Sequence, residues 1–284
     1  MVSIMLMMIA GGIGLAQAVT DPHRVTLQWL RLGGMIAVTL LAVALTVGAM
    51  TMATTEFPVR WFDGVLPGHG LLMEAALAVM ATAIVVQLVT VQLAMLRTQR
   101  IAAAISYVMS AFLAWAYLFQ YVGQVAGPPD PMGPPGGIAS VLAGSVTSAA
   151  VSAGLLGGTL MTMLLGHAYL TAGGKMTQVP FLRLARMLAA LLVLRVISSI
   201  ACLGPYLGSD MMLVDITSAW NMAMIASRFM VGIAVPAVFV WMIHDCIRHR
   251  SNQSATGILY VTLVMVVVGE GTALALLGAT GILF

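Results

Sequence analysis

Eight long runs of apolar residues follow one another along the chain, separated by short connectors. The runs cover approximately residues 2–19, 31–53, 70–96, 101–125, 145–171, 181–204, 215–245 and 256–283. An α-helix needs about 20 apolar residues to cross a bilayer, and the runs meet that length. None shows the ~10-residue alternating segments of barrel strands. The pattern predicts an all-α, polytopic transmembrane bundle of about eight spans, as a single domain over residues 1–284.

The connectors between the runs carry helix-breaking residues. Asp21-Pro22 follows the first run, Gly173-Gly174 follows the fifth, and Ala126–Gly137 is dense in proline and glycine. Ala16-Gln17-Ala18 resembles a signal-peptidase site, but no positive residue precedes the first apolar run. We therefore expect residues 2–19 to be a retained first span. The seventh run is long enough to be tilted or to project from the membrane.

Composition supports a chain whose outer surface faces membrane lipid. Hydrophobic residues make up 61% of the chain, charged residues 7%, and mean hydropathy is +1.05, whereas soluble domains carry about 25% charged residues. The formal charge of +3 comes from scattered basic residues, so no nucleic-acid partner is expected. Cys202 and Cys246 fall near opposite membrane faces, so we expect no disulfide between them.

Lysine and arginine predict the orientation of the bundle. Nine of them flank alternate connectors: Arg24, Arg31, Arg97, Arg100, Lys175, Arg183, Arg186, Arg248 and Arg250. The opposite side holds only Arg60. Because cytoplasmic loops are enriched in these residues, the side with nine is expected to be cytoplasmic. Both termini are then non-cytoplasmic, in the cytoplasmic (inner) membrane of a bacterium.

Three ionisable residues lie near the middle of predicted spans: Arg195, Arg228 and Glu270. A charge at mid-bilayer costs roughly 2.5–3.5 kcal/mol on insertion scales, so these residues should face inward and pair. Glu270 is the expected partner of Arg228 or Arg195, and one positive charge is left over. Asn221, carbonyls, water, or an anionic or quinone-type ligand are candidates to satisfy it. The cluster is either a ligand site or proton path, or a device that locks three helices together.

Gly269 and Gly271 flank Glu270 and indicate close helix packing or backbone contact with a ligand. The glycine-rich stretch Gly154–Gly158 lies inside a span and also indicates packing.

A second group of polar side chains lies on one face of the fourth span, near its outer end. Its members are Tyr117, Gln120, Tyr121 and Gln124. The group fits either an interfacial aromatic belt or the polar wall of an outward-opening cavity for a quinone headgroup.

His167 and His244 are candidates for the axial ligands of a haem b near the cytoplasmic face. Asp245 is a possible partner for His244, although adjacent residues of a helix do not face each other. A histidine at a membrane interface is also common without any ligand role. The 23 methionines are scattered and indicate packing or lipid contact rather than copper binding.

The eight spans and the last-span stretch Val268-Gly269-Glu270-Gly271 resemble the membrane-anchor subunits of molybdopterin oxidoreductases, the dimethyl sulfoxide and polysulfide reductase anchor families. The resemblance implies a subunit that reacts with quinone near the outer face and exchanges electrons with an iron–sulfur partner. That family's early histidine-containing helix motif is not found in this sequence. The stretches Gly166–Thr171 and Ser254–Tyr260 also look like signatures of a bacterial membrane family.

Three functions follow from these patterns. The first is a membrane subunit of a respiratory or redox complex that binds quinone or haem and anchors soluble partners. The second is a small-solute or ion transporter that uses the Arg195/Arg228/Glu270 cluster. The third is a structural assembly subunit of a membrane complex. No nucleotide loop, zinc-hydrolase motif or nucleophile elbow is present to name an enzymatic reaction.

Overall fold

The computed structural model describes residues 2–51, 70–126, 136–171, 177–203 and 218–280. At the edges of these ranges only the backbone is described, at residues 51, 70, 119–126, 136–143, 202–203 and 279–280. The described helices are α1 (Val2–Val19), η1 (Pro22–Arg24), α2 (Leu27–Thr51), α4 (Gly70–Gln92), α5 (Leu96–Ala126), α6 (Gly136–Thr171), α7 (Val179–Leu203), α8 (Ala219–Phe229), η2 (Met230–Ala234), α9 (Val235–Arg248) and α10 (Asn252–Thr280).

The prediction of eight membrane spans is confirmed. Within the described residues, eight helical segments are long and apolar enough to cross a bilayer. Seven of them are single helices, and the remaining one runs through α8, η2 and α9 as the 30-residue segment Ala219–Arg248. Its length comes from a helix that continues through one π-helical turn at η2.

Two helices begin earlier than the apolar runs predict, α5 at Leu96 and α7 at Val179. Arg97 and Arg100 lie in the first turns of α5, and Arg186 lies two turns into α7, so the connectors there are shorter than the apolar runs suggest. The turn between α4 and α5 is compressed to a few residues, with Ala94 at a φ of 57°. Long basic side chains can run along a helix toward the membrane surface, which lets them occupy terminal helical turns.

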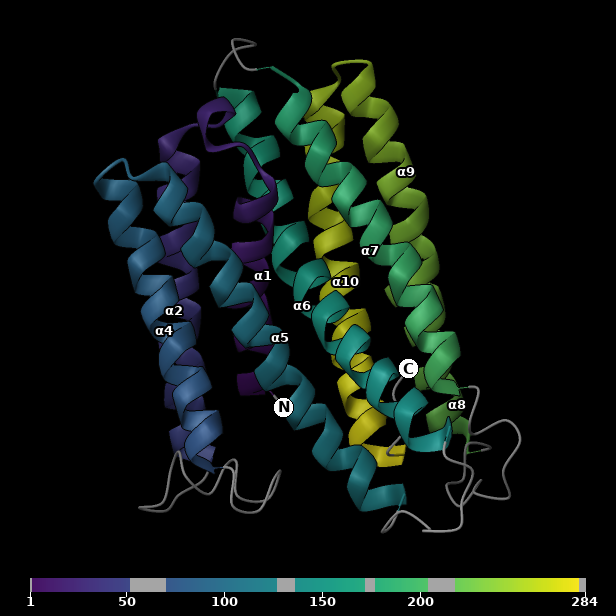
Figure 1. The fold of residues 1–284 in the computed structure, drawn as a ribbon. Helices are drawn as coiled ribbons and strands as arrows, with labels where there is room; N and C mark the ends of the chain where they lie inside the picture. The colour runs from purple at the N-terminus through teal and green to yellow at the C-terminus, as the bar shows by residue number, and fades with distance from the viewer. Residues whose placement is uncertain (1, 52–69, 127–135, 172–176, 204–217, 281–284) are drawn as a thin grey trace.

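The helices pack as two four-helix units (Figure 1). In the first unit, α1 packs on α2, α2 on α4, α4 on α5, and α5 back on α1. In the second unit, α6, α7, α9 and α10 repeat this circuit in the same order. The units meet mainly where α6 packs against α1 and α5. A four-plus-four arrangement is thus present in the packing, although the halves show no evident sequence repeat.

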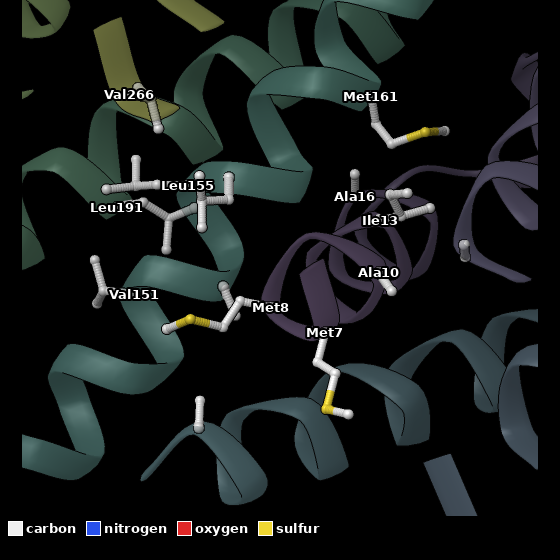
Figure 2. Close-up of a cluster of buried hydrophobic side chains, with 14 of the residues drawn as sticks. Met7, Met8, Ala10, Ile13, Ala16, Val151, Leu155, Met161, Leu191 and Val266 are labelled. Carbon is white, nitrogen blue, oxygen red and sulfur yellow. The ribbon is translucent and has the colours of Figure 1, made fainter. Parts of the chain in front are cut away.

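The first span lies in the centre of the bundle. Met7, Ala10 and Ile13 of α1 are 0% exposed. Figure 2 shows side chains of α1 beside those of α6, with Leu191 of α7 and Val266 of α10 completing the cluster. Helix α1 packs on α2, α5 and α6 and therefore forms part of the core of the bundle. Met7 and Met8 fill this core instead of facing lipid.

Glycines allow α1 and α6 to touch through their backbones. A Cβ atom at Gly12 would lie 1.8 Å from the carbonyl oxygen of Ala153, and one at Gly157 would lie 2.3 Å from the carbonyl carbon of Gly12. No larger residue fits either position without moving a helix. The packing interpretation of Gly154–Gly158 is therefore supported at Gly157.

One end of the bundle carries the basic connectors. The short connections at residues 20–26, 93–95 and 249–251 lie together at the upper end in Figure 1. Consecutive spans run in opposite directions, so α1 begins and α10 ends toward the lower end. Lys175 lies outside the described residues. The described connectors that carry the predicted basic residues therefore lie at one end of the fold, which we call the basic end.

Candidate functional site

The second unit buries the three charged residues singled out from the sequence. Arg195 comes from α7, Arg228 from α8 and Glu270 from α10, with relative exposures of 2%, 0% and 2%. Each of the three lies about eight to ten residues from the end of its helix that is farthest from the basic end. At 1.5 Å per residue, this places the cluster about 12–15 Å from those ends.

Glu270 is the centre of the cluster. Arg195 Nη2 donates to its Oε2 atom at 3.0 Å, and Arg228 Nη1 donates to its Oε1 atom at 3.2 Å. Ser152 of α6 also donates its hydroxyl to Oε2 at 2.7 Å. The predicted ion pairing is present, and one carboxylate connects all four spans of the second unit.

Arg195 is held by more than Glu270. Its Nη1 atom donates to Ser148 Oγ on α6 and lies 3.5 Å from the carbonyl oxygen of the same residue. These bonds attach α7 to α6 independently of α10. Breaking one partner of a buried ion pair typically costs 3–5 kcal/mol, so a group with several buried partners contributes strongly to assembly.

Arg228 is bonded differently. Its side chain is fully buried, yet its Nε and Nη2 atoms have no hydrogen-bond partner among the residues that the structure describes. Its one described side-chain bond is that of Nη1 with Glu270. A guanidinium has five N–H donors, and buried donors without acceptors are costly. Within the described part of the chain, the cluster therefore leaves two guanidinium nitrogens of Arg228 without an acceptor.

The backbone next to Arg228 departs from a regular α-helix. Residues Met230–Ala234 form a π-helical turn, and Pro236 follows in the first turn of α9. Such turns occur frequently at functional sites. The turn places Gly232 against Gly269 of α10, where a Cβ atom on Gly269 would lie 2.2 Å from the Gly232 Cα atom.

The two glycines that flank Glu270 differ in their surroundings. The prediction of close packing is correct for Gly269. It is wrong for Gly271, because a Cβ atom there would have no atom of the described residues within 4 Å.

Asn221 lies in the first turn of α8, where its backbone N–H donates to Ser218 Oγ at 3.2 Å. It stands seven residues before Arg228, about 10 Å along the helix axis. Its role as a partner of the cluster stays a prediction.

The predicted Tyr/Gln face of the fourth span is described in part. Tyr117 is 8% exposed and packs inside the bundle, which does not match a lipid-facing aromatic belt at this residue. Nearby, Trp115 Nε1 donates to Ser145 Oγ of α6 at 3.1 Å. Gln120, Tyr121 and Gln124 belong to α5, but their side chains lie outside the described part of the structure.

The two candidate haem ligands lie toward the basic end. His167 is exposed on α6, and His244 is half-buried on α9, facing a groove beside α7. Asp245 pairs with His249 at 3.5 Å, so its described partner is not His244. The described residues contain no cluster of three His, Cys, Asp or Glu side chains that could hold a metal ion. The assignment of His167 and His244 as haem ligands stays a prediction.

The first unit contains a polar network that sequence reasoning missed. Gln87 of α4 and Gln99 of α5 both donate to Gln17 Oε1 of α1 at 2.7 Å, and Gln17 donates to the carbonyl oxygen of Leu30 on α2 at 3.0 Å. All three glutamines are 0% exposed. The four helices are thus connected by neutral amides. Being uncharged, these residues gave no insertion cost large enough to single them out.

Ser148 and Ser152 were missed for a similar reason, because serine is common in membrane helices and marks no site alone.

No family model, curated protein or solved structure matches this chain. The site must therefore be interpreted from its own geometry.

Proposed function

We propose that this multi-pass membrane protein is the quinone-binding membrane subunit of a redox complex, with Arg228 and Glu270 at its binding site. The observation that carries the proposal is the fully buried Arg228 side chain, whose Nε and Nη2 atoms have no partner among the described residues. The confirmed eight spans and the Gly269-Glu270 pair agree with the resemblance to anchor subunits of molybdopterin oxidoreductases.

A quinone headgroup suits these donors. It is neutral and apolar enough to move within lipid, and its carbonyl oxygens accept hydrogen bonds from N–H groups. When bound, the quinone supplies the two-electron chemistry of the complex. Arg228 would orient one carbonyl through Nε–H and Nη2–H while its Nη1 atom stays fixed on Glu270. Arg195 would hold Glu270 in place from the other side.

The test is a titration of purified protein with a short-chain quinone, followed by the protein's thermal unfolding. A ligand that binds only the folded state stabilises it by about 2.7 kcal/mol at 100 times its Kd. The Arg228→Met variant retains one arginine and one glutamate at the cluster, so it should fold. We expect quinone to stabilise the wild type and to leave this variant unchanged. Equal stabilisation of both proteins would refute the assignment of Arg228.

A second candidate function is transport of a small anion through the same cluster. The π-helical turn at Met230–Ala234 and the repeated packing of the two units support it, because transporters commonly combine interrupted helices with structural repeats. In the same titration, stabilisation by small anions instead of quinone would favour this function. Uptake of such an anion into liposomes, lost in Arg228→Met, would establish it.

Location and partners follow from the proposed function. The basic end is proposed to face the cytoplasm of a bacterial inner membrane, which puts the Arg228 site nearer the outer face. The connectors described are short, so further subunits of the complex would contact the ends and lipid-facing sides of the bundle.

A purely structural assembly subunit would retain full complex activity after neutralisation of all three buried charges.

A further inference from the structure

A groove runs along the lipid-facing side of the second unit, between α7 and the η2–α9 segment. Its volume is about 390 Å³. One wall is formed by α7 and the other by η2 and α9. Most of the lining side chains are apolar, and the polar ones are Arg186 of α7 and His244 of α9.

The groove has a polar end and an apolar length. Because α7 and α9 are antiparallel neighbours, Arg186 and His244 line one end of the groove, and Val196 and Ile233 line the opposite end. Arg186 and His244 are on the side of the basic end. From Arg186 to Val196 the helix rises about 15 Å, at 1.5 Å per residue. That is about half of the hydrocarbon thickness of a bilayer, or one leaflet.

The groove is open sideways toward the acyl chains. Val193 and Trp241 on its two walls are 59% and 71% exposed. Ala189 and Ala237, which are also exposed, provide little side-chain volume between the walls. In a membrane, a hollow with apolar walls that is open to the lipid phase is filled most favourably by a hydrocarbon chain.

The charge at the polar end of the groove favours a lipid with an anionic headgroup. No acidic side chain lines the groove, and neither Arg186 nor His244 has an ion-pair partner among the described residues. Asp245, next to His244 in the chain, pairs with His249. Arg183 and Arg248 add exposed positive charge at the same end. Basic pockets between membrane helices bind anionic lipid headgroups in this way.

We propose that this groove is a binding site for an anionic phospholipid. The phosphate lies against Arg186 and His244, and one acyl chain follows the apolar walls as far as Val196 and Ile233. This site is separate from the Arg228–Glu270 cluster, so the lipid proposal does not depend on the quinone proposal.

The experiment compares lipid adducts of the purified protein by native mass spectrometry. Phosphatidylglycerol and phosphatidylcholine with identical acyl chains are the two probes. The variants are Arg186→Gln at the polar end and Ala237→Phe within the groove. Arg248→Gln is the matched control, because Arg248 lies at the same end of α9 without lining the groove.

Wild type and Arg248→Gln are expected to bind phosphatidylglycerol in preference to phosphatidylcholine. One basic residue near the surface contributes about 1 kcal/mol to anionic lipid binding, which corresponds to an about fivefold lower affinity for Arg186→Gln. Ala237→Phe should lower the affinity at least as far, because the ring occupies the space of the acyl chain. Each variant's melting temperature without added lipid shows that it is folded.

Three results would overturn the proposal. One is equal binding of the two lipids by the wild type, which indicates a groove without headgroup selection. Another is an equal loss in Arg186→Gln and Arg248→Gln, which indicates diffuse attraction at the basic end. The third is a photo-crosslinker at position 237 that labels a polypeptide instead of lipid in native membranes, which identifies the groove as a subunit interface.

Discussion

Replacing Gly269 by alanine tests the contact that holds the α8–η2 segment against α10. The added Cβ atom would lie 2.2 Å from the Gly232 Cα atom and 3.3 Å from Arg228 Nη1. Carbon atoms pack at about 3.5–4.0 Å, so the two backbones must move apart by more than 1 Å. Such overpacking typically costs about 1–3 kcal/mol. The same movement lengthens the 3.2 Å bond between Arg228 and Glu270.

Gly271→Ala is the matched control, because it makes the same chemical change two residues away, where a Cβ atom has nothing within 4 Å. We expect its free energy of unfolding to stay within about 0.5 kcal/mol of the wild type. The assay is thermal unfolding in detergent, followed by tryptophan fluorescence. A loss of 1 kcal/mol lowers Tm by about 2–4 °C in soluble chains slightly shorter than this one. Equal melting temperatures for the two variants would refute the inferred backbone contact.

Three further outcomes are expected. Glu270→Gln should lower the free energy of unfolding by about 3–5 kcal/mol, because it leaves two buried arginines without a carboxylate. Arg228→Met should lower it by less. The reverse order in denaturant unfolding would contradict the bonding described for the cluster. Gln17→Leu removes the acceptor of two buried amides and should cost about 1–3 kcal/mol, while Gln92→Leu at an exposed position serves as the control in the same assay. In a cysteine-free background, a cysteine at Ser251 should react with an impermeant maleimide only after the inner membrane is opened; labelling in intact spheroplasts would reverse the proposed orientation.

The spans could be predicted because each feature used was local and large in energy. Apolar runs of about 20 residues have few alternative structures in a membrane, and a buried charge requires a partner. Arg195, Arg228 and Glu270 are the only charged residues at that depth in the predicted spans, so their pairing followed once the spans were assigned.

Other features depend on which helix faces reach each other, and one sequence does not specify this. Gly269 and Gly271 are indistinguishable in sequence, yet only Gly269 meets another backbone. Gln17 appeared only as part of a possible cleavage site, whereas it organises the buried amides of the first unit. The π-helical turn at Met230–Ala234 left no signal except Pro236 nearby.

The central claim is that Arg228 is a quinone-binding residue and not only part of a lock between helices. Its most direct test is the amount of quinone that co-purifies with the protein from native membranes, determined by solvent extraction and chromatography. The wild type and Gly271→Ala are predicted to retain quinone at a constant ratio to protein, and folded Arg228→Met to retain almost none. The same ratio in Arg228→Met as in the wild type, or no quinone in any of the three proteins, would contradict the claim.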